Sequence, residues 1–459
     1  MQAHAIPHRD TALRGRGIRA LALAAVLLSG AVGGAVSAPP QTAVAAATPK
    51  AYVGLYGDDA IGVLDVATGR IVRTIKVAAG PEAVIVAPGG GRVYVSSEDA
   101  TSLSVIDTAS DAVTDTIDVG KFPEGMALSR DGETLVVGVF GTNQVDVIDT
   151  STLRITKRYT VGMAHGVTLA PDGKTAYVGS QVPGHNAIVV LDLATGRAAA
   201  RVQLAQAPRG LFVSPDAKSL YFTLANSAEV NVLDRATNTV TAHITVGPIP
   251  HQMAFTPDHK NALVVVQGAG QLAVVDLASH EVTATIRVGN FPHWVGITSD
   301  GTLAYVTNEG DDTVSVVDLA ARKVVATLPV GSGPRKISLQ QGTGAMTRYE
   351  ASSAAAATGF AGQPVQPAAP ARAGDVQIHM RAFAFGPASA TVAAGHRVTW
   401  IDDDPVPHTA TAQTTHGKLW DTGQVVPGAA ITVTMTKPGT FQYQCDDHPF
   451  MLAKLVVTP

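Results

Sequence analysis

A repeat of about 42 residues constrains the fold of this 459-residue chain more than any other feature. Each copy carries an aspartate after an apolar pair, and these aspartates lie 42 or 43 residues apart: Asp65, Asp107, Asp149, Asp192, Asp234, Asp276 and Asp318. A second marker keeps the same register at Tyr52, Tyr94, Val136, Tyr177, Tyr221, Leu263 and Tyr305. Such periodicity indicates a repeat architecture, so residues 50–340 should form one domain of seven units.

Each unit contains four short segments rich in Val, Ile, Thr and Tyr, with turn residues between them. In the last full copy the predicted strands span residues 294–298, 303–307, 313–318 and 323–329. Four strands per copy predict the blades of a β-propeller. The units resemble the YVTN propeller repeats, because Tyr305-Val306-Thr307-Asn308 carries that signature. The resemblance implies a seven-bladed propeller and says little about function.

The phase of the repeat predicts how the ring closes. The first copy begins at its second strand, with Tyr52, and the seventh copy is followed by an extra strand of the first type at residues 335–339. We expect this last strand to complete the first blade on its inner side, because such closure removes free sheet edges.

One polar residue follows the turn before each predicted innermost strand. These positions should meet at one mouth of the central channel: Glu82, Glu124, His165, Arg209, His251, His293 and Arg335. Loops between the second and third strands should join that face with Asp58, Asp59, Glu98, Asp99, His185, Asn226, Asn308 and Asp311. One interpretation is a solvated mouth where opposite charges compensate. The other is a substrate or second metal site that uses the three histidines.

Composition and the N-terminus bear on the compartment. Arg14, Arg16 and Arg19 precede an apolar run, and Val36-Ser37-Ala38 suits a cleavage site, so residues 1–38 read as a signal peptide. The mature chain should be periplasmic or secreted, without a membrane span. The formal net charge of −4 argues against nucleic acid as a partner. Residues 341–373 are rich in Ala, Pro and Gly and read as a flexible linker.

The single cysteine, Cys445, excludes an internal disulfide, a multi-cysteine zinc site and an iron–sulfur cluster. It lies in residues 374–459, whose clearest predicted strands span 376–380, 397–401, 430–436, 440–444 and 453–457 and suit a small β-sandwich. His448 and Met451 share its loop, and His408 comes from a distant strand end. One thiolate, two imidazoles and one thioether are the ligand set of a blue-copper site.

This segment resembles the cupredoxins, and in particular the amicyanin and plastocyanin group. The similarity runs through Val398-Thr399-Trp400-Ile401, Pro407-His408-Thr409 and the C-x2-H-x2-M loop, whose short spacing is similar to that of amicyanin. The resemblance implies a Greek-key sandwich with one type 1 copper held by His408, Cys445, His448 and Met451. It also implies that His448 is the exposed edge for electron transfer.

These features leave three functions open. The first is an exported one-electron carrier whose propeller is a docking platform for a redox partner protein. The second is an oxidoreductase that reacts at the propeller mouth and uses the copper as a relay, and the third is copper storage. The runs Asp402-Asp403-Asp404 and Asp446-Asp447 suggest an acidic copper end and therefore a cationic partner surface.

Overall fold

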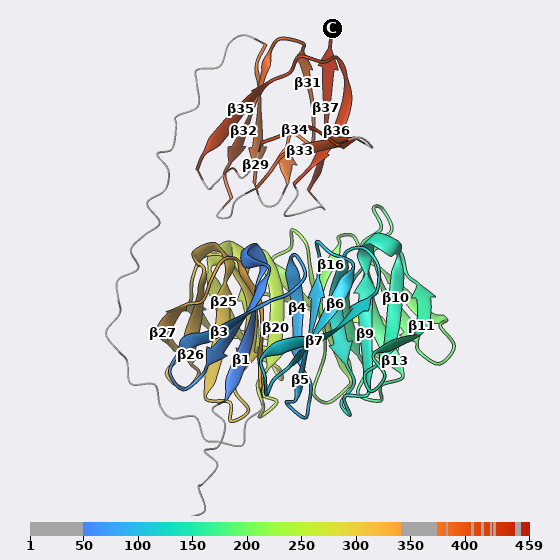
Figure 1. The fold of residues 1–459 in the computed structure, drawn as a ribbon, viewed down its shortest axis with the longest axis vertical. Helices are drawn as coiled ribbons and strands as arrows, with labels where there is room; N and C mark the ends of the chain where they lie inside the picture. Colours follow the sequence, from blue (N-terminus) through green and yellow to red (C-terminus); the bar gives the residue numbers. More distant parts are fainter. Residues whose placement is uncertain are drawn as a thin grey trace, which may run out of the picture. The chain divides into compact units, whose positions relative to one another are not determined.

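The computed structural model describes residues 49–340 and 374–459, apart from 382–383, 405–407, 415–416, 423–424, 426–427 and 446–450. The predicted signal peptide and linker therefore lie outside the described residues. The described chain is built of strands (Figure 1), which confirms the all-β prediction. Its helices are four short 3-10 turns: η1 (Tyr56–Asp58), η2 (Phe140–Thr142), η3 (Gln267–Ala269) and η4 (Glu309–Asp311). No helix in the described ranges is long and apolar enough to cross a membrane.

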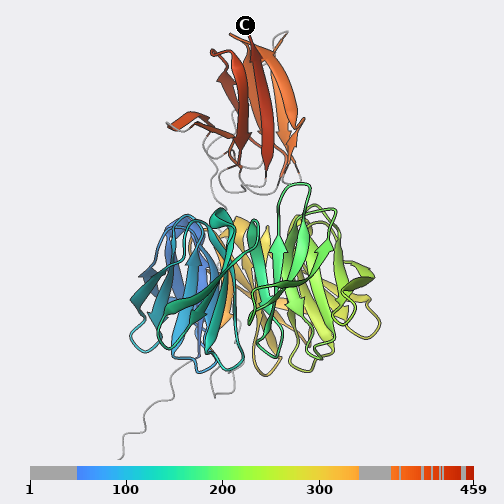
Figure 2. The same ribbon diagram turned by 90° about the vertical axis from the view of Figure 1, so that its right-hand side faces the viewer.

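Seven four-stranded antiparallel sheets form the blades of a propeller (Figures 1 and 2). The first three blades are β28 (Pro334–Leu339), β1 (Lys50–Leu55), β2 (Ala60–Asp65), β3 (Arg70–Lys76); β4 (Pro81–Val86), β5 (Arg92–Ser97), β6 (Ser102–Asp107), β7 (Ala112–Asp118); and β8 (Pro123–Leu128), β9 (Thr134–Val139), β10 (Gln144–Asp149), β11 (Arg154–Thr160). The fourth and fifth are β12 (Ala164–Leu169), β13 (Thr175–Ser180), β14 (Ala187–Asp192), β15 (Ala198–Gln203); and β16 (Pro208–Val213), β17 (Ser219–Leu224), β18 (Glu229–Asp234), β19 (Thr239–Thr245). The last two are β20 (Pro250–Phe255), β21 (Asn261–Val266), β22 (Gln271–Asp276), β23 (Val282–Arg287); and β24 (Pro292–Ile297), β25 (Leu303–Asn308), β26 (Thr313–Asp318), β27 (Lys323–Pro329).

The ring closes as the repeat phase predicts. Strand β28 pairs antiparallel with β1, so that Ile337 lies opposite Val53, and together with β2 and β3 they make one blade. Because the two ends of the domain pair in this way, every blade has an innermost strand. Ile337 is 2% exposed and packs with Val53 and Leu55 in the core of this blade.

The repeated aspartate has a local structural role. In each copy it ends the third strand of the blade, and its carboxylate accepts hydrogen bonds from backbone amides in the following turn. Asp234 Oδ1, for example, accepts from the amides of Ala236 at 3.0 Å and Thr237 at 2.8 Å. An aspartate is favoured here because its short carboxylate can reach the amides two and three residues further on.

Every innermost strand carries the same irregularity of register. In β4, Pro81 pairs with Ser97 and Val84 with Val95, so two residues, Glu82 and Ala83, lie opposite one. This two-against-one pairing is that of a β-bulge. The seven inner strands contact one another in the order β4, β8, β12, β16, β20, β24, β28 and back to β4, and so surround a central channel.

The C-terminal part is a β-sandwich of two sheets (Figure 1). One sheet contains β30 (Phe385–Gly386), β29 (Val376–Met380), β32 (Arg397–Asp402) and β35 (Ala430–Thr434). The other contains β31 (Ser389–Ala393), β37 (Leu452–Thr458), β36 (Gly439–Gln444), β33 (Thr411–Thr414) and β34 (Gly417–Asp421). The five strands predicted from the sequence are present, whereas β30, β31, β33 and β34 were not predicted. Strand β30 has only two residues, and β31 alternates but buries only the small side chains of Ala390 and Val392.

Because Ile337 joins the last strand to the first blade, Ile337→Ala should lower the free energy of unfolding by about 2–5 kcal/mol. Val72→Ala on the outer strand β3 is the matched control, since Val72 is 56% exposed and its loss should cost less than about 0.5 kcal/mol. Urea unfolding followed by circular dichroism measures both values. Equal, small effects of the two substitutions would contradict the role given to ring closure.

Candidate functional site

The described residues among the predicted copper ligands lie at the ends of strands. Cys445 follows β36 directly, and Met451 precedes β37 directly. The Cys445 amide donates to the Met451 carbonyl at 3.2 Å, which closes the loop between them. His448 lies within this loop, outside the described residues. His408 forms an isolated antiparallel bridge with Val425, which fixes its backbone.

The structure brings His408 and Cys445 together in a buried site. Both side chains are 0% exposed, and Met451 is 1% exposed. The His408 Nδ1 atom lies 3.8 Å from the Cys445 Sγ atom. The Thr409 amide nitrogen lies 3.2 Å from the same sulfur and donates a hydrogen bond to it. A backbone donor of this kind stabilises a thiolate, which is the form of cysteine that binds metals.

A second contact orients the imidazole. The Nε2 atom of His408 lies 2.9 Å from Oδ2 of Asp404, and Asp404 is only 6% exposed. When the carboxylate accepts a hydrogen bond from Nε2–H of the neutral imidazole, Nδ1 carries no proton and faces the sulfur. Carboxylates that hold the outer nitrogen of a metal-binding histidine fix its tautomer and its ring plane in the same way. Asp404 was not recognised in this role from the sequence, although its position four residues before His408 was a weak signal.

Aromatic side chains pack in the same buried hydrophobic cluster as Cys445. Tyr443 is 2% exposed, and its ring packs edge to face on Phe385 at 4.7 Å and on Trp400 at 5.9 Å. Asp402, at the end of β32, is also fully buried. Its Oδ1 atom accepts a hydrogen bond from the Asp404 amide at 2.9 Å, whereas its Oδ2 atom has no hydrogen-bond partner among the described residues. Burial raises the pKa of Asp402 to about 8.

The acidic run is not the exposed patch that the sequence suggested. Asp402 and Asp404 are buried, and Asp403 forms an ion pair with His379 at 2.6 Å. Asp402 and Asp404 therefore add no exposed carboxylate to the surface, and Asp403, which contacts His379, is the exposed member of the run. Asp446 and Asp447, the other acidic pair, lie outside the described residues.

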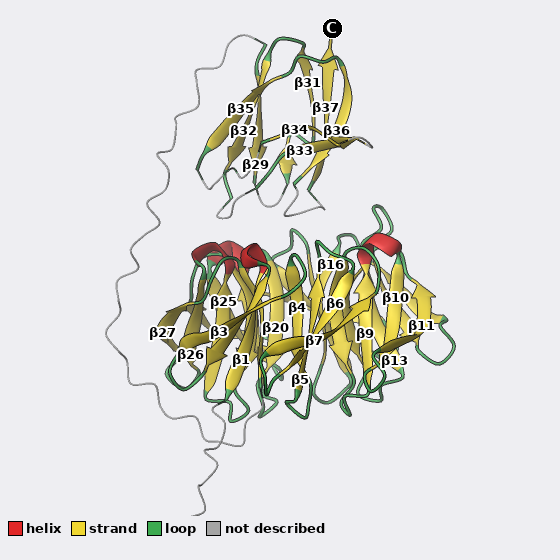
Figure 3. Ribbon diagram, in the orientation of Figure 1, coloured by secondary structure: helices red, strands yellow, loops and turns green. Residues whose placement is uncertain are grey.

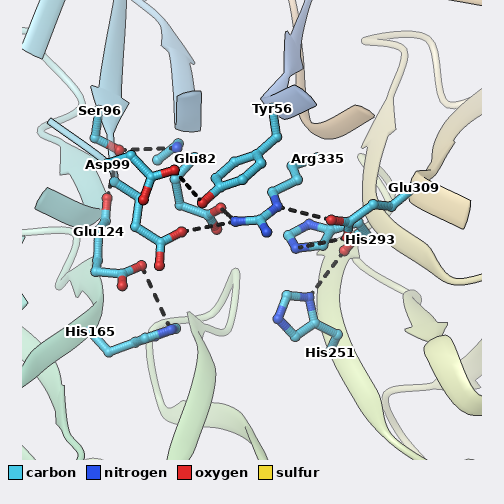
Figure 4. Close-up of polar contacts among 12 residues, drawn as sticks. Tyr56, Glu82, Ser96, Asp99, Glu124, His165, His251, His293, Glu309 and Arg335 are labelled. Atoms are coloured by element: carbon cyan, nitrogen blue, oxygen red, sulfur yellow. Dashed lines mark hydrogen bonds and ion pairs between the residues drawn. The ribbon is translucent and has the colours of Figure 1, made fainter. Parts of the chain in front are cut away.

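The predicted ring of polar residues gathers at one mouth of the propeller channel, with Arg335 at its centre (Figure 4). The Arg335 Nη1 atom binds Glu82 at 2.7 Å and Glu98 at 2.9 Å, and its Nε atom binds Glu309 at 3.1 Å. Its guanidinium also stacks on Tyr56, 3.5 Å from the ring centroid. The tyrosine hydroxyl donates to Asp99 at 2.8 Å. Figure 3 shows the 3-10 turns that supply Tyr56 and Glu309 at this face of the propeller.

The pKa values of these carboxyl groups diverge because they share one cation. Burial raises the pKa of Glu82, but Arg335 outweighs it and holds the pKa below its usual value. Burial raises the pKa of Glu98 to about 7 against the pull of Arg335. Burial, then the negative charges of Glu98 and Glu82, raise the pKa of Glu124 well above its usual value. Among these three carboxyl groups, Glu82 is therefore the most easily ionised.

The ring histidines are neutral and do not converge on one point. Burial lowers the pKa of His165 to about 4 and places those of His251 and His293 well below the usual value. The His251 and His293 rings meet edge to face at 4.5 Å, and His251 Nδ1 donates to the His293 carbonyl at 3.3 Å. Within the described ranges no three His, Cys, Asp or Glu side chains are grouped so as to hold a metal ion, so the interpretation of the mouth as a second metal site gains no support.

Of the polar loop residues predicted at this face, Glu98 binds Arg335, whereas others hold neighbouring turns. Asp58 accepts from the Ser332 amide at 2.8 Å, and Asp59 accepts from the Gly80 amide at 3.0 Å. Tyr56 and Glu309 were not predicted from the sequence, because the loops between second and third strands vary in composition and neither residue recurs at one phase of the repeat.

Comparisons with known proteins agree with both parts of the fold. The YNCE-like β-propeller family matches residues 34–173 and 168–346, and the cupredoxin-like domain family matches residues 352–457. Amicyanin-alpha of Methylorubrum extorquens is 30% identical over 89 residues, which are 19% of this chain and 75% of that protein. Amicyanin of Paracoccus denitrificans is 36% identical over 70 residues, 14% of this chain and 52% of that protein. Among solved structures, hydrazine synthase of Kuenenia stuttgartiensis is 23% identical with a TM-score of 0.49, over 55% of this chain and 87% of that one.

The fold and the matches together define a β-propeller protein with a C-terminal cupredoxin-like domain. The chain belongs to the YNCE-like β-propeller family, and its cupredoxin-like domain has amicyanins among its relatives. These matches confirm the two resemblances inferred from the repeat and from the ligand loop.

Because burial raises its pKa to about 8, Asp402 binds a proton in the folded chain at pH values where the unfolded chain has released it. The protonated carboxyl group is tolerated in the core, so the free energy of unfolding is unaffected below about pH 4. It falls as pH rises towards 8, because the folded chain must then hold a proton or bury a charge. Asp402→Asn should therefore raise the free energy of unfolding by more than about 1 kcal/mol at pH 9 and leave it nearly unchanged at pH 4. Urea unfolding of both proteins across this range measures the difference, and a pH-independent difference would contradict the assignment.

Removing Arg335 would leave three carboxyl groups that are at most 18% exposed without their cation. Arg335→Gln should lower the free energy of unfolding by about 3–5 kcal/mol at pH 8. The loss should shrink towards pH 5, because the glutamates can then be protonated. Arg73→Gln on the outer strand β3, where Arg73 is exposed, is the matched control and should change stability by less than about 0.5 kcal/mol at either pH. Equal losses at pH 8 and pH 5 would argue against charge compensation.

Proposed function

We propose that this protein is an exported one-electron carrier whose cupredoxin-like domain holds one copper ion through His408, Cys445, His448 and Met451. The observation that carries the proposal is the buried pair of His408 Nδ1 and Cys445 Sγ, 3.8 Å apart, with the opposite imidazole nitrogen bound to Asp404. A thiol, an imidazole and a thioether buried at one end of a sandwich fit copper by their chemistry. When bound, copper supplies a one-electron redox couple.

The chain's own residues prepare the site for this chemistry. Asp404 holds His408 in the orientation that offers Nδ1, and the Thr409 amide donates to the sulfur. The buried rings of Tyr443, Trp400 and Phe385 keep water from the interior beside the cysteine. A site fixed by its surroundings limits rearrangement when the electron arrives or leaves. In this proposal His448 is the exposed edge through which electrons pass.

The wider proposal concerns compartment and partners. The leader at residues 1–38 directs export, and the mature chain works in the periplasm or outside the cell. The propeller is a platform that docks a redox partner protein, and the linker gives the cupredoxin-like domain reach. A cationic docking surface on that partner now rests on Asp446 and Asp447 rather than on the inward-facing Asp402 and Asp404.

The second candidate function is an oxidoreductase that reacts at the propeller mouth and relays electrons to the copper. The buried cluster around Arg335, with its unequal carboxyl pKa values, favours this candidate over a plain solvated mouth, since such groups are common at reactive sites. Copper storage is the third candidate. Reversible exchange of one electron per chain separates the carrier from the store.

Cys445→Ser should abolish the intense visible absorption of the copper-loaded full chain, because that band requires the thiolate. His408→Gln should shift or abolish it as well, since it removes the second described ligand. The matched control is His379→Gln in the same domain, whose side chain is 46% exposed and pairs with Asp403, and it should keep the band. Visible spectra and metal analysis measure these effects, with circular dichroism to show that each variant is folded.

Persistence of the band in folded Cys445→Ser would overturn the site. A titration of the wild-type chain with ascorbate and then ferricyanide tests the carrier function, and one electron per copper taken up and returned is the expected result. Tightly held copper that does not exchange electrons would favour storage.

Expression of the full chain in a bacterial host, with mass spectrometry of the periplasmic fraction, should show a mature N-terminus after Ala38.

A further inference from the structure

Below the polar ring, the inner strands enclose a cavity of about 300 Å³. The bulge described above places two consecutive residues of each inner strand opposite one. The first of each pair forms the ring, and the second is small in four successive blades and large in the other three: Ala83, Gly125, Gly166, Gly210, Gln252, Trp294 and Lys336. All seven line the cavity.

The glycines on one side of the cavity follow from close strand packing. A Cβ atom on Gly125 would lie 2.8 Å from the His165 carbonyl oxygen, and one on Gly210 would lie 2.7 Å from that of His251. Neighbouring inner strands therefore approach too closely for side chains here. The small residues on this side leave the space of the cavity. The functional groups at this level come from Gln252, Trp294 and Lys336 on the other blades.

The most unusual of these is Lys336. It is 8% exposed, and its Nζ atom lies 4.2 Å from the centroid of the Trp294 ring. In the described part of the chain it has no ion-pair or hydrogen-bond partner. Burial lowers the pKa of Lys336 to about 8, against the attraction of Glu82. A buried ammonium is costly unless an opposite charge accompanies it, and a ring face compensates only part of that cost.

The nearby carboxyl groups do not meet this need. Glu82 is bound to Arg335 at 2.7 Å, as are Glu98 and Glu309 through their own contacts with the guanidinium. Glu124 also lines the cavity, and burial raises its pKa well above the usual value, which disfavours its ionised form. An anion entering the cavity would therefore meet the Lys336 ammonium beside carboxyl groups whose charge is compensated by Arg335 or disfavoured by burial.

The rest of the wall fits an organic molecule better than an inorganic ion. Arg209 adds a second cation to the lining, and His165, which also lines the cavity, has a buried Nδ1 atom without a hydrogen-bond partner among the described residues. Deeper in the channel the lining is apolar, with Leu211 and Phe212 as examples. About 300 Å³ is at the lower end of the range for small-molecule sites.

From these contacts we infer that the propeller channel is a binding site for a small organic monocarboxylate, whose carboxylate pairs with Lys336 and whose apolar part lies against Leu211 and Phe212. Trp294 holds the ammonium in place and borders the bound ligand. The site is independent of the copper ligands, so binding does not require the proposed electron transfer.

Isothermal titration calorimetry of the copper-free full chain tests the inference with acetate, butyrate and benzoate as probes, each paired with its neutral amide. At least one carboxylate should bind at one site per chain, and its amide should bind at least about tenfold more weakly. Lys336→Met should weaken the carboxylate by a similar factor, and it should fold because it replaces a buried charge by an apolar chain of similar size. Lys323→Met on the outer strand β27, where Lys323 is exposed, is the matched control and should leave binding unchanged.

A second readout does not depend on Lys336. Ligand binding should change the tryptophan fluorescence of the wild-type chain, and Trp294→Phe should remove that change. Cys445→Ser should bind the carboxylate as the wild type does, which separates this site from the copper proposal. The inference is overturned if none of the probes binds at millimolar concentration, if carboxylate and amide bind equally, or if folded Lys336→Met binds as tightly as the wild type.

Discussion

The pairing of β28 with β1 is the contact on which the propeller depends. It joins residues more than 270 positions apart in sequence, Val53 to Ile337, and makes the first blade from both ends of the domain. Without it, the first blade would lack its innermost strand and the ring of inner strands would be open. A channel with a defined mouth exists only because this ring is closed, and the polar cluster around Arg335 includes a residue of the closing strand itself.

In both candidate sites, polar groups that prefer water are removed from it and are stabilised by a charged or hydrogen-bonding partner. At the mouth, one guanidinium is shared among three carboxylates. It holds the pKa of Glu82 below its usual value, while burial raises that of Glu98 to about 7. In the cupredoxin-like domain, Asp404 is buried against the imidazole of His408, which in turn faces the sulfur of Cys445. Where no opposite charge is bound, as at Lys336 and Asp402, burial shifts the pKa in the direction that favours the neutral form of the side chain.

Much of the architecture was accessible from the sequence because it repeats. Seven copies of one pattern fix the strand number, the phase of closure and the ring positions, since an error in one copy is corrected by the others. The sandwich has no repeat that could support a weak pattern. Strands β31 and β33 were not predicted because they are short and contain few large apolar side chains. The ligand loop was predicted from a thiol, an imidazole and a thioether within seven residues, and from its resemblance to the cupredoxins.

What the sequence could not show is which polar residues meet. The acidic run at Asp402 suggested a charged surface, yet its alternation along the end of β32 turns two carboxyl groups inward. Tyr56 and Glu309 reach Arg335 from loops of two different blades, and no pattern along the chain marks that meeting. Lys336 follows Arg335 directly, but only the bulge shows that both belong to the channel.

The central claim is that Cys445 and His408 bind copper together. X-ray absorption at the copper edge of the loaded full chain tests it most directly, because that spectrum reports the atoms bound to the metal. The account predicts one copper per chain with one short bond to a thiolate sulfur and two bonds to imidazole nitrogens. A spectrum with nitrogen and oxygen neighbours only, in a chain that is folded and fully loaded, would contradict it.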